Sequence, residues 1–145
     1  MTNTRTIQVF EVSLKAALFH DGRLLLLQEA DTSYWELPGG RIDVGEERLP
    51  HADILAREIG EELGGDLRYT LRYEAVTWVR QRPTDGVFQM ICARLADVSD
   101  PRLRLSSEHM NFRWCTPEDW AALEFPPLSD YQNGLSRIWE IRSHG

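Results

Sequence analysis

The sequence is poor in cysteine and in long apolar runs, and each shortage excludes a class of protein. Its two cysteines, Cys92 and Cys115, form neither a C-x-x-C motif nor a cluster with histidine, so we expect no zinc site. We expect both thiols to be reduced and to lie in the core. No apolar stretch is long enough to cross a bilayer, and the N-terminal residues do not resemble a signal peptide. These absences predict a cytoplasmic protein with no membrane partner.

Basic residues are also scarce. The chain has 16 Lys and Arg against 23 Asp and Glu, which gives a formal net charge of −7. Contact with a nucleic-acid backbone normally requires a basic surface, so we expect no nucleic-acid partner. A small-molecule nucleotide remains compatible with this charge, because a metal cation held between carboxylates and phosphates offsets the repulsion of like charges.

The pattern of apolar residues predicts a single domain over residues 1–145. Strands are expected at residues 8–19, 24–27, 34–37, 67–80, 87–95 and 112–115, and an Asp21-Gly22 turn should join the first two as a hairpin. A helix is expected to end at Gly64, a short helix to follow Thr116, and a final helix to be capped by Ser129. This order predicts an α+β fold in which a mixed β-sheet lies between helices as an α/β/α sandwich.

The helix that ends at Gly64 carries a crowded acidic face. Glu58 and Glu62 are four residues apart and therefore neighbours, and Glu61 lies beside them. Like charges at this spacing destabilise a helix by about 0.2–0.5 kcal/mol per pair, and a bound Mg²⁺ or Mn²⁺ would offset that repulsion. A solvated acidic face is the alternative interpretation. The opposite face is predicted to pack on the core through Ala52, Leu55, Ala56, Ile59 and Leu63.

The segment from residue 40 to residue 65 resembles the Nudix box, G-x5-E-x7-R-E-U-x-E-E-x-G-U, in which U is aliphatic. Its fixed positions are filled in order by Gly40, Glu46, Arg57, Glu58, Ile59, Glu61, Glu62 and Gly64. The sequence departs from the box in two places. Ten residues separate Glu46 from Arg57 where the family usually has seven, and Gly65 replaces the final aliphatic residue. The three extra residues would form either a longer loop or an added helical turn.

The resemblance implies roles for the matching residues. Glu58, Glu61 and Glu62 would be metal ligands together with the carbonyl oxygen of Gly39. Glu58 would be either a ligand or the general base, Arg57 would orient its carboxylate, and Glu61 would belong to the catalytic set. Glu46 would support the loop and the helix. Glu108, in a late loop, would supply a further metal ligand, and the alternative is an exposed loop glutamate.

The residues that contact the substrate are less well defined by the resemblance. The glycine-rich loop would bind substrate through Gly40 and Arg41. Trp35 and Phe88 would stack on a base, although strand residues of this type are as often part of a core. His109 would be a base only if it departs from the usual exposed position of a lone loop histidine.

The predicted function is metal-dependent hydrolysis of a phosphoanhydride in a nucleoside diphosphate linked to another group. A MutT-like nucleoside triphosphate pyrophosphohydrolase comes first, and an ADP-ribose or sugar-nucleotide pyrophosphatase is the alternative. A Nudix module that binds nucleotides without turnover is a second class of hypothesis. An unrelated Ca²⁺-binding domain comes last, because the loop lacks the alternating oxygen ligands of an EF-hand. Apolar strand edges are compatible with a homodimer.

Overall fold

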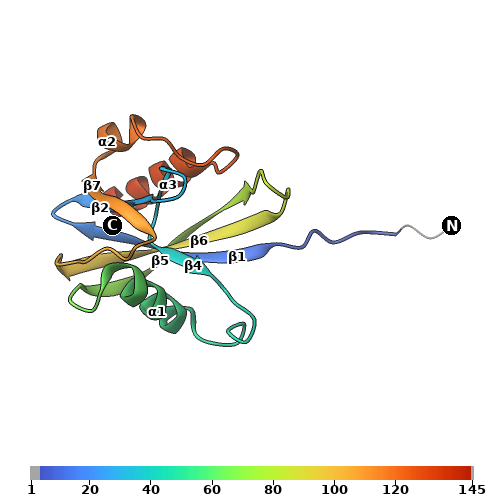
Figure 1. The fold of residues 1–145 in the computed structure, drawn as a ribbon, viewed down its shortest axis with the longest axis horizontal. Coiled ribbons are helices and arrows are strands. Elements are labelled where there is room, and N and C mark those ends of the chain that lie inside the picture. Colours follow the sequence, from blue (N-terminus) through green and yellow to red (C-terminus); the bar gives the residue numbers. More distant parts are fainter. Residues whose placement is uncertain (1–3, 145) are drawn as a thin grey trace.

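The computed structural model describes residues 4–144 (Figure 1). A seven-stranded sheet forms the centre of the fold, with strand order β3-β2-β1-β6-β5; β4 also pairs with β1, and β7 with β2. The strands are β1 (Glu11–His20), β2 (Arg23–Glu29), β3 (Trp35–Glu36), β4 (Gly39–Arg41), β5 (Arg68–Gln81), β6 (Phe88–Asp100) and β7 (His109–Cys115). The β1–β6 pair is parallel and the other pairs are antiparallel. The sheet is therefore mixed, as predicted.

The helices cover opposite faces of this sheet. On one side lies α1 (His51–Leu63), which packs Ile54, Leu55 and Ile59 against apolar residues of β1 and β2. On the other side lie α2 (Pro117–Ala121) and α3 (Tyr131–His144), whose buried residues pack against β5, β6 and the opposite face of β1 (Figure 1). The chain thus has two apolar layers, one on each face of the sheet, which confirms the predicted α/β/α sandwich.

The first hairpin forms where the Asp-Gly signal predicted it. Phe19 and His20 pair with Leu24 and Arg23, and the turn between the strands places both Asp21 (φ 50°) and Gly22 (φ 73°) in the left-handed region. Two successive residues at positive φ define the tight turn that matches the twist of the flanking strands, and Asp-Gly tolerates it well. Local turn chemistry therefore sets the register of the central strand.

The acidic helix is rotated relative to the predicted stripe. Ala56, expected to face the core, is exposed, and Ile54 is buried in its place. Glu62 was expected to face outward but is buried with 4% of its surface exposed. The reason is tertiary: the side of α1 that carries Glu62 contacts β4, so this carboxylate points between the helix and the sheet.

The glycine-rich segment is a short strand rather than the predicted loop. Gly39, Gly40 and Arg41 pair with Lys15, Leu14 and Ser13 of β1. A Cβ atom at Gly39 would overlap the Leu14 carbonyl oxygen, so only glycine allows the two backbones to approach this closely.

The two cysteines are both free, with Cys115 buried and Cys92 half-buried, as expected of reduced residues in strands. Across residues 4–144 no helix is both long and apolar enough to span a bilayer.

Candidate active site

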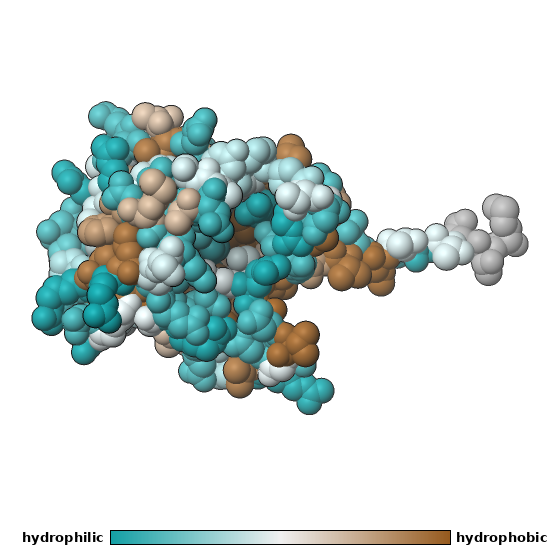
Figure 2. Space-filling model, in the orientation of Figure 1, coloured by the Kyte–Doolittle hydropathy of each residue, from teal (hydrophilic) through white to brown (hydrophobic). Residues whose placement is uncertain are grey.

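A polar cavity of about 530 Å³ opens between α1 and the first turn of α3. Glu58 and Glu62 of α1, residues 39–41 of β4, and Glu108 form one part of its wall. Arg80 of β5 and Gln89 of β6 form another part. Figure 2 shows this face of the molecule, on which mostly hydrophilic residues surround a hollow. The cavity brings together residues from nine helices and strands, spread over most of the sequence.

Glu62 lies deepest among the acidic side chains of α1. The backbone N–H of Gly39 donates a hydrogen bond to Glu62 Oε2 over 3.3 Å. Burial raises the pKa of Glu62 to about 7, even though Lys15 and His109 nearby favour the charged form. A cation bound to this carboxylate would offset the free-energy cost of burying its charge, so cation binding is favoured at Glu62.

A buried cluster of charged residues adjoins Glu62. Lys15 Nζ lies 3.5 Å from the Gly39 carbonyl oxygen and 3.9 Å from Glu36 Oε1, and His109 Nε2 lies 3.1 Å from the same Glu36 oxygen. Burial lowers the pKa of Lys15, but Glu36 and the other neighbouring acids outweigh it and raise that pKa overall. Burial raises the pKa of Glu36, and Lys15 and His109 more than reverse that effect.

Sequence reasoning missed most of this cluster. The sequence-based prediction of the site includes neither Lys15 nor Glu36. His109, predicted to be an exposed loop residue, is buried with 6% of its surface exposed. The available signal was a charged residue in an otherwise apolar strand: Lys15 interrupts the run from Leu14 to Phe19. Such a residue is rarely fully buried without a partner, so its partner had to be sought elsewhere in the chain.

Glu58 fits against the backbone of the second glycine. A Cβ atom at Gly40 would lie 2.5 Å from the Glu58 carboxylate, so the absence of a side chain at Gly40 makes room for it. Burial raises the pKa of Glu58, while Arg57, whose Nη2 is 3.2 Å from Glu58 Oε1, acts in the opposite direction. Arg57 therefore lies within ion-pair distance of the carboxylate that the resemblance expects it to orient.

Arg57 also ties the helix to the preceding loop. Its Nε and Nη2 donate to Glu46 Oε2 over 3.0 and 2.7 Å, so this pair forms across the ten intervening residues. Arg57 Nη1 donates to Glu61 as well, at 3.3 Å. Glu61 has 60% of its side chain exposed and does not line the cavity. The structure thus places this predicted ligand and catalytic residue outside the cluster that Glu58 and Glu62 form.

The remaining predicted residues are divided between the cavity and the core. Glu108, Gly40 and Arg41 line the cavity. Trp35 does not, because its side chain packs in the core on the α3 side of the sheet. Phe88 lines a neighbouring hollow and packs against Phe10, with ring centroids 6.2 Å apart. Neither aromatic side chain faces the acidic cavity, which corrects the stacking role expected of Trp35 and Phe88.

Comparison with known proteins explains this arrangement. The NUDIX domain family model matches residues 12–132, which include the box and all of the residues that line the cavity. The chain belongs to the Nudix family. A MutT-like protein from Streptomyces ambofaciens is 34% identical over 101 residues, which cover 68% of this chain and 58% of that protein. The matched part of the chain therefore spans less than two thirds of the length of that MutT-like relative.

Solved structures share the Nudix fold over almost the whole chain. The solution structure of the E. coli ORF135 protein is 26% identical, covers 94% of each chain and has a TM-score of 0.67. A C. elegans Ap4A hydrolase binary complex is 23% identical, covers 94% of this chain and 99% of its own, and has a TM-score of 0.73. At this identity the second likeness concerns the fold alone.

The donor set of this Nudix site suits a hard divalent cation. Glu58, Glu62 and Glu108 offer carboxylate oxygens, and the Gly39 carbonyl lies on the same wall. Within residues 4–144, no three acidic, histidine or cysteine side chains converge into a preformed metal cage. Mg²⁺ does not need one, because it keeps several waters and shares its coordination with substrate phosphates. The oxygen donors in this wall therefore suit a hard divalent cation such as Mg²⁺. Lys15 already contributes one positive charge to the same wall.

Proposed function

We propose that this Nudix protein hydrolyses a phosphoanhydride bond in a small nucleotide, with Mg²⁺ or Mn²⁺, and releases a nucleoside monophosphate. The observation that supports this most strongly is the position of Glu58 and Glu62. Both carboxylates line a cavity of nucleotide size beside the closely packed glycine backbone of β4. An acidic cavity binds a polyphosphate only if cations offset the charge, and this cluster supplies oxygens to hold them.

Different residues of the cavity would bind the metal, accept a proton and supply positive charge. Glu58, Glu62, Glu108 and the Gly39 carbonyl would hold the metal, which when bound would offset phosphate charge and lower the pKa of a coordinated water. Glu58 is either one of these ligands or the base that accepts the proton of the attacking water, and Arg57 fixes its direction. Lys15 adds a buried positive charge beside the Gly39 carbonyl and Glu62.

The substrate class extends from nucleoside triphosphates to ADP-ribose and sugar nucleotides. We place a nucleoside triphosphate first, as the sequence predicted, with the MutT-like relative in support. A nucleotide-binding module without turnover is the competing function. The outward position of Glu61 is the observation that favours it, because Glu61 would be one of the metal ligands that the box implies.

Turnover of a substrate panel tests the proposal. The panel comprises the common nucleoside triphosphates, ADP-ribose, a sugar nucleotide and Ap4A, each with Mg²⁺, with Mn²⁺ and with EDTA. Products are converted to orthophosphate by inorganic pyrophosphatase or alkaline phosphatase and measured by colour. We expect metal-dependent hydrolysis of at least one substrate, whereas binding without hydrolysis of any would support the non-catalytic module.

A matched pair of variants connects the activity to the site. Glu62→Gln keeps the shape of the buried side chain but removes its charge, and we expect turnover to fall at least tenfold. Glu140→Gln makes the same change on the exposed face of α3 and should leave turnover unchanged. Thermal unfolding in EDTA reports on the fold of both variants. Unchanged turnover in a folded Glu62→Gln protein would remove Glu62 from the site.

A further inference from the structure

Arg80 is a cavity residue whose charge has no acidic partner among residues 4–144. It lies in β5, is half-buried, and lines the same cavity as Glu58 and Glu62. Its Nε is buried and makes no hydrogen bond, and no acidic side chain of residues 4–144 forms an ion pair with its guanidinium. A buried N–H of a guanidinium is costly to leave unpaired, so an acceptor for Arg80 Nε is expected in the cavity.

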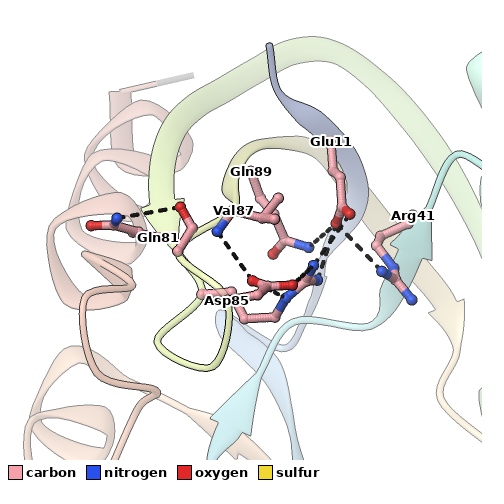
Figure 3. Close-up of polar contacts among 8 residues, drawn as sticks. Glu11, Arg41, Gln81, Asp85, Val87 and Gln89 are labelled. Carbon is pink, nitrogen blue, oxygen red and sulfur yellow. Dashed lines mark hydrogen bonds and ion pairs between the residues drawn. The ribbon is translucent and has the colours of Figure 1, made fainter. Parts of the chain in front are cut away.

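Gln89 is the direct cross-strand neighbour of Arg80 and lines the cavity beside it. Its side-chain nitrogen donates to Glu11 Oε1 over 2.9 Å (Figure 3). A carboxylate only accepts hydrogen bonds, so this contact requires the NH₂ group of the amide to face Glu11. The carbonyl oxygen Oε1 of Gln89 is thereby left as an acceptor that no donor among residues 4–144 occupies.

The orientation of Gln89 is fixed by a network of hydrogen bonds around Glu11. Glu11 also accepts hydrogen bonds from Arg82, at 3.1 and 3.3 Å, and from Arg41, at 3.3 Å (Figure 3). Arg82 in turn binds Asp85 in the turn between β5 and β6. Glu11 is therefore a positioning residue, because it cannot turn away from Gln89 without breaking two further contacts.

Arg80 and the acidic side chains Glu58 and Glu62 line different parts of the same cavity, far enough apart to contact opposite ends of one nucleotide. Across the strand order β4, β1, β6, β5, the register places Gly39 in line with Val76, and Arg80 lies four residues further along β5. Three strand spacings of about 4.8 Å and four residues of about 3.3 Å separate the Cα atoms of Gly39 and Arg80 by about 20 Å, a span that an extended nucleoside triphosphate and the side chains at its two ends cover together. A nucleotide whose phosphates lie at Glu58 and Glu62 therefore reaches Arg80 and Gln89 with its base.

We propose that Arg80 and Gln89 select a nucleobase whose edge carries two adjacent acceptors followed by a donor, as guanine and cytosine do. This inference rests on the proposed nucleotide function of the cavity. The Arg80 fork donates to N7 and O6 of guanine or to O2 and N3 of cytosine. Gln89 Oε1 then accepts from guanine N1–H or cytosine N4–H. On the corresponding edges of adenine and thymine, acceptors alternate with donors. One N–H of the Arg80 guanidinium would then face a donor of the base instead of an acceptor.

Comparing the four bases tests this selection. With Mg²⁺ we expect kcat/KM for dGTP and dCTP to exceed that for dATP and dTTP by at least about tenfold. In Arg80→Ala, kcat/KM should fall at least about tenfold more for dGTP and dCTP than for dATP and dTTP. Gln89→Leu removes the acceptor and should reduce the same preference. Arg23→Ala, an exposed arginine outside the cavity, should leave all four values unchanged.

Binding of the four deoxynucleoside monophosphates, measured by calorimetry, separates this inference from the proposed function. A preference for dGMP and dCMP that Arg80→Ala removes supports base selection even if no substrate is turned over. Turnover without base preference leaves the proposed function intact and overturns the selection. An equal loss for all four bases in Arg80→Ala also overturns it, because a contact with phosphate would be insensitive to the base.

Discussion

Glu11 shows how a single residue couples stability to pH. Hydrogen bonds from Arg82, then Gln89 and Arg41, lower the pKa of Glu11 from 4.5 to about 2. The folded state therefore prefers the ionised carboxylate, and its stabilising effect is complete above pH 4.5. It is lost as the pH falls from 4.5 through about 2, where the folded protein also takes up the proton.

We predict that Glu11→Gln lowers the free energy of unfolding at pH 7 by about 1 kcal/mol. The lowered pKa of Glu11 alone would correspond to a larger loss of unfolding free energy, but 36% of the side chain is exposed and solvent screens its charge. The difference from the wild type should shrink between pH 4.5 and pH 3 in urea unfolding experiments. A difference that stays constant over this range would show that the Glu11 charge is not what stabilises the fold.

At the scale of single elements, local signals predicted the fold well where chemistry within a few residues decides it. The Asp21-Gly22 hairpin formed as predicted, and α2 begins with the predicted Thr116 cap, reinforced by Asp119. Ser129 failed as a cap because α3 begins two residues later, at Tyr131. The strand character of Gly39–Arg41 could not be predicted, because it depends on pairing with β1 rather than on the glycines themselves.

Two glycines of the box region provide a matched test of what the β4–α1 contact does. In Gly40→Ala the new methyl group meets the Glu58 carboxylate, which is flexible and swings aside. We predict a loss of turnover of at least tenfold with little loss of stability, measured by steady-state kinetics and thermal unfolding. Gly60→Ala on α1 meets no atom within 4 Å and should stabilise the helix by about 0.5–1 kcal/mol.

The two substitutions should therefore separate activity from stability. If Gly40→Ala turned over substrate normally, the close approach of β4 to Glu58 would have no role in the chemistry. If it unfolded the protein, the contact would be structural rather than catalytic. Normal turnover in Gly60→Ala serves as the control for a change of the same size within the box.

At the scale of the whole molecule, the sequence predicted which layers exist but not which side chains meet between them. The acidic residues of α1 were found because they lie within one helix. Lys15, Glu36 and His109 come from three different strands, and Arg80 and Gln89, nine residues apart, come from the two strands of a hairpin. Their contacts depend on strand order and register, and a single sequence carries no local pattern that specifies either.

The packing of α3 on the sheet places Tyr131 in the wall of the cavity. This packing requires a residue without a side chain at Gly134. A Cβ atom at Gly134 would lie 2.7 Å from the ring of Trp78, which is held by its own hydrogen bond to the Ser129 carbonyl. Gly134→Ala should therefore push α3 away from β5 and lower the free energy of unfolding by about 1–3 kcal/mol in denaturant titrations. Because Tyr131, one turn earlier, lines the cavity, KM should rise in the same variant. Gln132→Ala, exposed on the same helix, is the control, and equal stability of the two variants would show that α3 does not depend on this close approach.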